Sequence, residues 1–188
     1  MGNLDGGAIL NKEYPGLGDV VPSSANCSLI RGLGALIYKS IDIDGTGGEV
    51  ITSLFTFTGP IELVELWLVL TDVSDITTLS GVYFDAYDEA NSVPLTADGQ
   101  DLSGSTLNSI AVKDQDDAQV LRLLDADQVR YQESASFPRE FLGGLINIKN
   151  GATNTIRLRA DTDADTDVSL TVYMAYNCRH ISTVVSVA

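Results

Sequence analysis

Hydrophobic and polar residues alternate along two neighbouring stretches near the C-terminus. The apolar positions are Ile156, Leu158 and Ala160 in the first stretch, and Val168, Leu170, Val172, Met174 and Tyr176 in the second. A period of two with one apolar face is typical of a half-buried β-strand. Residues 161–167 join the two stretches and carry aspartate at every second position. The sequence therefore predicts two antiparallel strands that form a hairpin around an acidic loop.

Similar short apolar segments, separated by glycine, proline and aspartate, recur along the chain. We expect strands at 29–43, 50–58, 61–70, 82–88, 110–112, 119–124, 141–149 and 183–187. The segment 61–70 is apolar on both faces, which is typical of a strand covered on both sides. At 116–133 a helix capped by Asp116 and Asp117 is the alternative to the strand. This pattern predicts an all-β fold, an antiparallel, jelly-roll-like β-sandwich.

The first part of the chain has a different composition. Residues 1–27 mix glycine and proline with isolated apolar residues and show no sustained period. We expect an extended N-terminal arm at 1–27 and the sandwich domain at 28–188. Two interpretations of the arm stay open: it orders along a neighbouring subunit, or it is a loose tail.

The charge of the chain excludes several classes of partner. The formal net charge is −15 and the basic residues are scattered. Binding to nucleic-acid phosphates or to an anionic membrane needs a basic patch, so we expect neither partner. The longest apolar stretch, 61–70, contains Glu62 and Glu65 and is shorter than the roughly 20 residues of a membrane helix. No secretory signal is visible, so we expect synthesis in a cytoplasm. An acidic surface that favours solubility is the simpler explanation of the charge, and adaptation to salt or Ca²⁺ is the alternative.

Catalytic chemistry finds little support. The only histidine, His180, lies two residues after Cys178, and no third group that would orient it is identified. The pattern of glycines matches no phosphate-binding loop. The other cysteine, Cys27, is far away in sequence; two buried thiols are the preferred interpretation and a single disulfide is the alternative. We expect no enzyme activity and no cofactor.

A metal site is the one open chemical question. Four carboxylates stand at alternate positions in the acidic loop: Asp161, Asp163, Asp165 and Asp167. Oxygen ligands of this kind suit Ca²⁺, but Thr166 and Val172 stand where an EF-hand needs glycine and glutamate. A solvated loop is the simpler alternative. Asp42 and Asp44, which precede Gly45, are a weaker candidate.

Four segments of the sequence resemble parts of a known group of proteins. The segments 59–67, 82–88, 101–104 and 109–112 are similar to parts of small β-sandwich virion proteins of tailed bacteriophages, and the likeness extends over roughly 50–180. The likeness is general and includes no diagnostic motif, so no functional residue is transferred from it. It implies a structural protein of the capsid surface, a decoration or cement protein or a short head fibre. The implied partners are the major capsid protein and further copies of the chain, often as a homotrimer.

These considerations predict a non-enzymatic virion protein that bridges and stabilises capsomers. We expect the arm and residues 183–187 to make contacts between subunits. A carbohydrate- or receptor-binding module is the alternative, with Tyr83, Tyr87 or Tyr173 as stacking platforms. A hydrolase that uses scattered aspartates is a third class.

Overall fold

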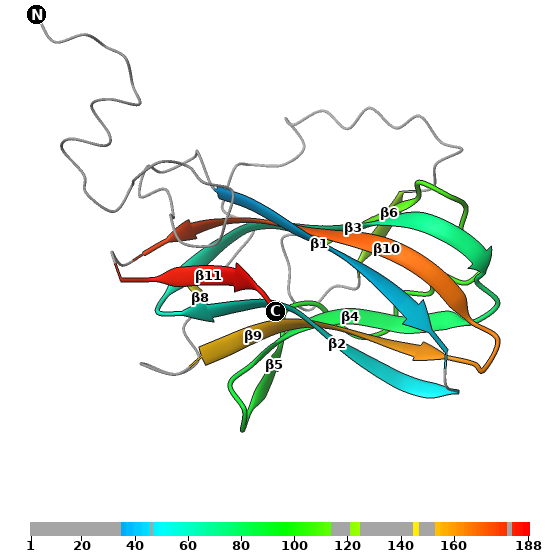
Figure 1. Ribbon diagram of the computed structural model, residues 1–188, viewed down its shortest axis with the longest axis horizontal. Helices are drawn as coiled ribbons and strands as arrows, with labels where there is room; N and C mark the ends of the chain where they lie inside the picture. The colour runs from blue at the N-terminus through cyan, green and yellow to red at the C-terminus, as the bar shows by residue number, and fades with distance from the viewer. Residues whose placement is uncertain (1–34, 46, 114–120, 125–144, 147–152, 180–181) are drawn as a thin grey trace, which may run out of the picture.

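The computed structural model describes residues 35–45, 47–113, 121–124, 145–146, 153–179 and 182–188. These residues form two antiparallel β-sheets that pack face to face (Figure 1). Sheet A consists of β1 (Ala35–Asp44), β10 (Asp167–Cys178), β3 (Ile61–Asp75), β6 (Ile110–Val112) and β7 (Arg122–Leu124), with β8 (Leu145–Ile146) paired to β3. Sheet B consists of β11 (Val184–Val187), β2 (Gly48–Thr58), β9 (Thr153–Thr162), β4 (Leu79–Tyr87) and β5 (Ser92–Pro94). The prediction of an all-β sandwich is confirmed.

The order of the strands is that of a jelly roll. Strands β1 to β4 alternate between sheet A and sheet B, and later strands return along them. Antiparallel pairs form between β1 and β10, β2 and β9, β3 and β6, and β4 and β5. Such a ribbon of four antiparallel pairs, wrapped so that neighbours fall in opposite sheets, is a double Greek key. The jelly-roll expectation is thus confirmed by the topology.

The predicted hairpin between the two C-terminal stretches is wrong. Strand β9 pairs with β2 and β4 in sheet B, whereas β10 pairs with β1 and β3 in sheet A. The acidic loop therefore crosses from one sheet to the other. Alternation reveals which face of a strand is apolar but not which strand lies beside it, so a hairpin and a crossing between sheets give the same pattern. Both apolar stripes point into the core from opposite sides.

Two glycines allow the chain to turn tightly where it crosses between the sheets. A Cβ at Gly45, after β1, would lie 1.9 Å from the carbonyl oxygen of Asp163, in the neighbouring crossing. The two crossings are joined there by a hydrogen bond from the Gly45 N–H to the carbonyl oxygen of Thr166. Gly59, between β2 and β3, has φ +82°, a left-handed conformation that favours glycine.

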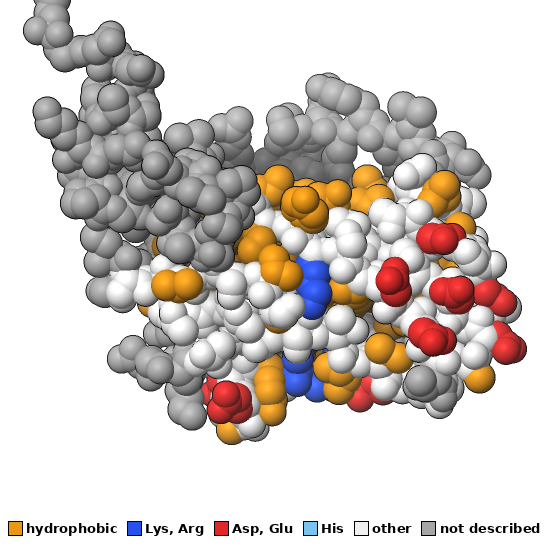
Figure 2. All heavy atoms as spheres, viewed as in Figure 1, with side chains coloured by type: hydrophobic (Ala, Val, Ile, Leu, Met, Phe, Trp, Pro, Cys, Tyr) orange, Lys and Arg blue, Asp and Glu red, His pale blue; other side chains and the backbone are white. Residues whose placement is uncertain are grey.

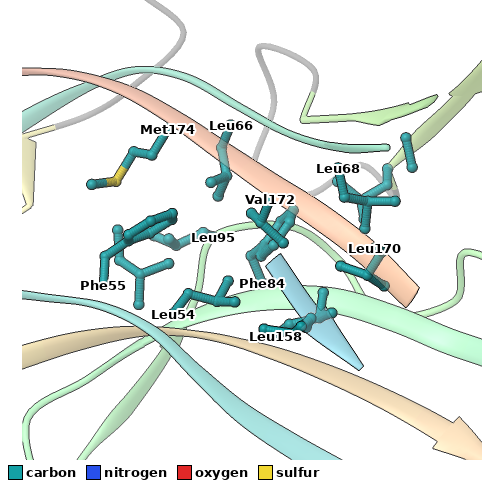
Figure 3. Packing of buried hydrophobic residues seen from close by; sticks show 14 of the residues in the cluster. Leu54, Phe55, Leu66, Leu68, Phe84, Leu95, Leu158, Leu170, Val172 and Met174 are labelled. Carbon is teal, nitrogen blue, oxygen red and sulfur yellow. The ribbon is translucent and has the colours of Figure 1, made fainter. Parts of the chain in front are cut away.

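The core fills the space between the sheets with aliphatic and aromatic side chains (Figure 3). Residues labelled there come from both sheets, apart from Leu95, which follows β5: Leu54, Phe55, Leu66, Leu68, Phe84, Leu95, Leu158, Leu170, Val172 and Met174. A register shift between Ser53 and Phe55 lets Leu54 and Phe55, although adjacent, both be buried. The inner faces are thus fully used, and the outer faces are where the molecule meets its surroundings.

Most of the predicted strands lie where the sequence placed them. The doubly apolar segment 61–70 is part of β3, which has neighbours on both sides in sheet A. Residues 122–124 form β7, which agrees with the strand rather than the helix. Residues 183–187 contain β11, at the edge of sheet B. The predicted arm at 1–27, and most of the segment 141–149, lie outside the described residues. No helix within the described part of the chain is long and apolar enough to cross a membrane.

Candidate functional site

The outer face of sheet A is divided into an apolar half and an acidic half. Side chains alternate along each strand, so every second residue of β1, β10, β3 and β6 points away from the core. The residues of this surface, which we name the sheet A face, are Leu36, Tyr38, Ser40, Asp42, Asp44, Glu65, Trp67, Val69, Asp72, Asp75, Ile110, Val112, Asp167, Ser169, Thr171, Tyr173 and Ala175. None of them is lysine or arginine.

A row of aromatic side chains crosses the apolar half. The cross-strand register places Tyr38, Tyr173 and Trp67 side by side on β1, β10 and β3. The rings of Trp67 and Tyr173 are stacked, with centroids 5.2 Å apart and planes 7° apart. Tyr38 packs on the other side of Tyr173 at 5.8 Å, tilted by 35°. The rings of Trp67 and Tyr173 thus cover each other, and Tyr38, on the edge strand β1, is the outermost ring of the row.

The edge strand β1 exposes the apolar half to solvent. Tyr38 is 62% exposed and its neighbour on the same face, Leu36, is 59% exposed. Large apolar side chains exposed next to each other differ from the single ones scattered over most protein surfaces. The row therefore forms a candidate contact surface.

The acidic half lies where β1 and β3 end and β10 begins. Five exposed carboxylates gather there on three adjacent strands: Asp42, Asp44, Asp72, Asp75 and Asp167. Figure 2 shows acidic side chains concentrated at this end of the molecule. Three of the carboxylates accept hydrogen bonds from hydroxyl groups of Ser169, Ser74 and Thr77. None of the five forms an ion pair with a described lysine or arginine.

The outer face of sheet B carries a different arrangement, centred on a buried ion pair. Asp85, on β4, has no exposed surface and is bound in a bidentate manner by Arg157 on β9. Arg157 Nε donates to Oδ1 at 2.9 Å and Nη2 donates to Oδ2 at 2.5 Å. Arg159 Nε and the hydroxyl of Ser92 also donate to Oδ2, at 2.9 and 2.6 Å. Four hydrogen bonds thus hold this carboxylate, three of them on Oδ2, and it has no exposed surface through which a substrate could reach it.

Tyrosine rings and a second carboxylate complete this network. The guanidinium carbon of Arg157 lies 3.8 Å from the centre of the Tyr87 ring, and that of Arg159 lies 5.8 Å from the centre of the Tyr83 ring. Arg159 also forms an ion pair with Glu49 at 2.8 Å. Both arginines are thus neutralised by carboxylates within the network and covered by aromatic rings.

The electrostatics of Asp85 indicate a structural rather than a catalytic carboxylate. Burial alone would raise its pKa, but the hydrogen bonds from Arg157 and Ser92, with the charges of Arg157 and Arg159, outweigh burial and hold the pKa below its ordinary value. A general acid or base that works near neutral pH needs a pKa shifted toward 7. Asp85 is shifted in the opposite direction and stays ionised.

The four aspartates proposed as calcium ligands are distributed over different surfaces. Asp161 is an exposed residue on the outer side of sheet B, and Asp167 lies on the sheet A face. Asp163 accepts hydrogen bonds from the Thr166 hydroxyl at 2.7 Å and from the Asp165 N–H at 3.2 Å. These bonds, the Thr166 hydroxyl foremost, lower the pKa of Asp163. Within the described ranges, no three acidic, histidine or cysteine side chains are grouped so that they could hold a metal ion.

The remaining candidates from the sequence divide into three cases. Tyr173 lies on the sheet A face, whereas Tyr83 and Tyr87 lie with the arginines of sheet B. His180 and Cys27 lie outside the described residues. Cys178 is disulfide-bonded, so the expectation of a free thiol is wrong for this residue. Bridging depends on the separation of two cysteines in space, which their spacing along the chain does not reveal.

Sequence reasoning missed Asp85, Arg157 and Trp67 as members of sites. A signal for the first two was present, because each is a charged residue inside a strongly alternating strand. Charged side chains at such positions are often paired across strands. Trp67 is preceded and followed by leucine in the sequence, so the pattern does not show that its ring lies on an outer face.

Comparisons with known proteins give no relative for the chain: no protein-family model, no curated protein and no solved structure matches it.

Proposed function

We propose that this chain is a non-enzymatic structural virion protein of a tailed phage, which decorates or cements the capsid by docking its sandwich onto capsid subunits. The observation that carries the proposal is the sheet A face, where Tyr38 and Leu36 are exposed beside a stacked aromatic row. Aromatic side chains exposed together are enriched where proteins contact proteins. The function would be mechanical, since each docked copy buries surface across a seam between capsomers.

The fold and the sheet B face agree with this proposal. Jelly rolls are common in virus capsids, although lectins and cupins share the topology, so the fold alone does not choose between them. In the Asp85 network, carboxylate and guanidinium groups bind one another and leave no nucleophile or free base. Such a network supports a rigid scaffold rather than a reaction.

Co-sedimentation of the purified chain with capsids of the phage that encodes it tests the proposal. We expect the chain to pellet with capsids and to stay in the supernatant without them. Capsids should also resist heat longer when the chain is bound, because bridged seams open less readily. A chain that never pellets with capsids would contradict the proposal. Sedimentation velocity of the free chain tests the homotrimer that the resemblance implies.

A carbohydrate-binding module remains the second candidate, and Tyr38 is the observation that favours it. Its side chain is largely exposed on the edge strand β1, and a sugar could stack there. The stacked pair Trp67 and Tyr173 offers no further platform, because each ring covers the other. Binding to a glycan array that is lost in Tyr38→Ala, without capsid binding, would favour this candidate over the structural role.

A further inference from the structure

The carboxylates of the sheet A face stand in an unfavourable order for an isolated molecule. The register pairs Asp44 of β1 with Asp167 of β10, and Asp167 in turn with Asp75 of β3. Three like charges therefore lie in one row across three neighbouring strands. Like charges directly opposite each other destabilise a sheet. Asp42 and Asp72, which flank Ser169 in the next row, add two further negative charges.

Nothing on the described part of this face compensates that charge. The ion pairs among the described residues use Arg157, Arg159 and Arg179, none of which lies at the acidic half. Lys39 points to the other side of β1 and donates to the carbonyl oxygens of Ser53 and Ala188. The carboxylates of the acidic half can therefore pair with basic side chains of another molecule.

The apolar and acidic halves are continuous and belong to one surface. Tyr38 and Asp44 are on the same strand and the same face. At about 3.4 Å per residue, their Cα atoms are roughly 20 Å apart. A standard protein interface covers about 800 Å² on each partner, which is enough to include both halves.

We infer that the partner that docks on the sheet A face is a protein surface with an apolar patch next to a cluster of lysine or arginine side chains. This inference rests on the proposed function, for which it specifies the chemistry of the capsid surface. Charge complementarity selects this partner, because the face offers aromatic rings at one end and, at the other, five carboxylates that form no ion pair with a described cation. A cationic partner would relieve the repulsion in the row from Asp44 to Asp75 and would gain in association rate.

A second copy of the chain that docked through the same face would fit poorly. The outer positions of β1, β10, β3 and β6 contain no basic residue, and the one arginine of strand β7, Arg122, is paired with Val112 in the aromatic row, away from the acidic half. Two such faces would bring carboxylates against carboxylates or against aromatic rings. We therefore expect no self-pairing through this face, and the experiment below would detect it.

Trp67 supplies a reporter for the test, because it is the only tryptophan of the chain and lies in the aromatic row. The probe is a short peptide of alternating lysine and leucine, titrated into the full chain at about 0.1 M salt while Trp67 fluorescence is measured. A peptide of alternating glutamate and leucine is the matched control probe. We expect saturable binding of the lysine peptide alone.

Two triple variants with the same change in charge separate the face from the overall charge. Asp44→Asn, Asp75→Asn and Asp167→Asn together should weaken binding by about tenfold, since they remove the charges nearest the bound cations. The control variant replaces three exposed acids outside the sheet A face, by Glu89→Gln, Asp98→Asn and Asp161→Asn. It should change binding by less than about twofold, because charges beyond a Debye length of about 10 Å are screened.

The same variants are then tested for co-sedimentation with capsids. This second measurement distinguishes a failure of the proposed capsid role from a failure of the proposed partner chemistry. If capsids bind the wild-type chain and both triple variants equally, the inference is overturned and the structural role stands. If the lysine peptide binds as expected but capsids do not, the structural role is overturned and the chemistry of the face stands. Equal binding of both peptides, or a dimer that Tyr38→Ala abolishes, would also overturn the inference.

Discussion

The outer faces of the two sheets each combine tyrosines with charged residues, but they dispose of charge in opposite ways. On sheet B, Asp85 accepts hydrogen bonds from two arginines, and Glu49 binds the second of them, so positive and negative groups balance. On the sheet A face, five carboxylates meet no described cation and the aromatic rings pack on one another. The first arrangement is complete within the chain and the second is not.

This difference indicates which face contributes to stability and which to recognition. A buried ion pair with all its hydrogen bonds tolerates no loss of a partner, because the remaining charge would be buried alone. An exposed face with unbalanced charge tolerates substitution well but changes what the molecule can bind. Substitutions on sheet B should therefore affect unfolding, and those on the sheet A face should affect binding.

The largest effect is expected for Asp85→Asn. The substitution removes the charge that neutralises the buried Arg157, so the free energy of unfolding should fall by about 3–5 kcal/mol. Urea unfolding followed by circular dichroism measures the change. The exposed Asp98→Asn is the matched control and should change stability by less than about 0.5 kcal/mol. A loss below about 1 kcal/mol in Asp85→Asn would show that the network is not essential to the fold.

Acid should remove a part of the same stabilisation. The pKa of Asp85 is lower in the folded protein than its ordinary value, so the carboxylate binds protons more weakly when folded. Its contribution is therefore complete above the unfolded pKa of about 3.9 and is lost as the pH falls through the folded pKa. The difference in unfolding free energy between wild type and Asp85→Asn should be constant from pH 7 to about 5 and should shrink below about pH 4. A difference that shrinks near neutral pH would contradict the assignment.

Two tyrosines provide a matched pair, one on each face. Tyr87→Leu removes the ring beside Arg157 and the hydrogen bond from the Tyr87 hydroxyl to the Glu89 carbonyl oxygen. Its cost should be about 1–2 kcal/mol, the range for a desolvated cation–π contact. Tyr38→Leu removes an exposed ring that packs on Tyr173 and should cost about 0.5 kcal/mol, the lower end for an aromatic pair. Thermal unfolding of both variants decides this, and equal losses would remove the distinction between the faces.

The sequence predicts the fold class and the positions of most strands, but it does not predict which strands pair. Alternation identified the β10 stripe and the edge segment 183–187, because burial on one face imposes a period of two wherever a strand lies. The partner of each strand depends on contacts between segments far apart in sequence, which the pattern does not contain. The acidic loop shows this well: four residues between β9 and β10 look like a hairpin and in fact cross between sheets.

The sites were predicted less well than the fold. The aspartates at 161–167 are close in sequence, yet β9 lies in sheet B and β10 in sheet A, so Asp161 and Asp167 lie on different outer faces. The groups that do come together, Asp85 with Arg157 and Tyr38 with Trp67, are joined only by cross-strand register. Tyr173, expected as a stacking platform for a carbohydrate, lies on the sheet A face with its ring stacked on Trp67, a contact that only the cross-strand register reveals.

The smallest effect, and the one that most sharpens the comparison, is expected for Asp167→Asn. Asp167 stands between Asp44 and Asp75, so its neutralisation removes two like-charge pairs at once. The free energy of unfolding should rise by a few tenths of a kcal/mol at low salt, because like charges opposite each other destabilise a sheet. The gain should vanish near 1 M salt, where the Debye length is about 3 Å. A loss of stability instead would mean that the carboxylates of the sheet A face are held by favourable contacts, as Asp85 is, and the two faces would no longer differ in kind.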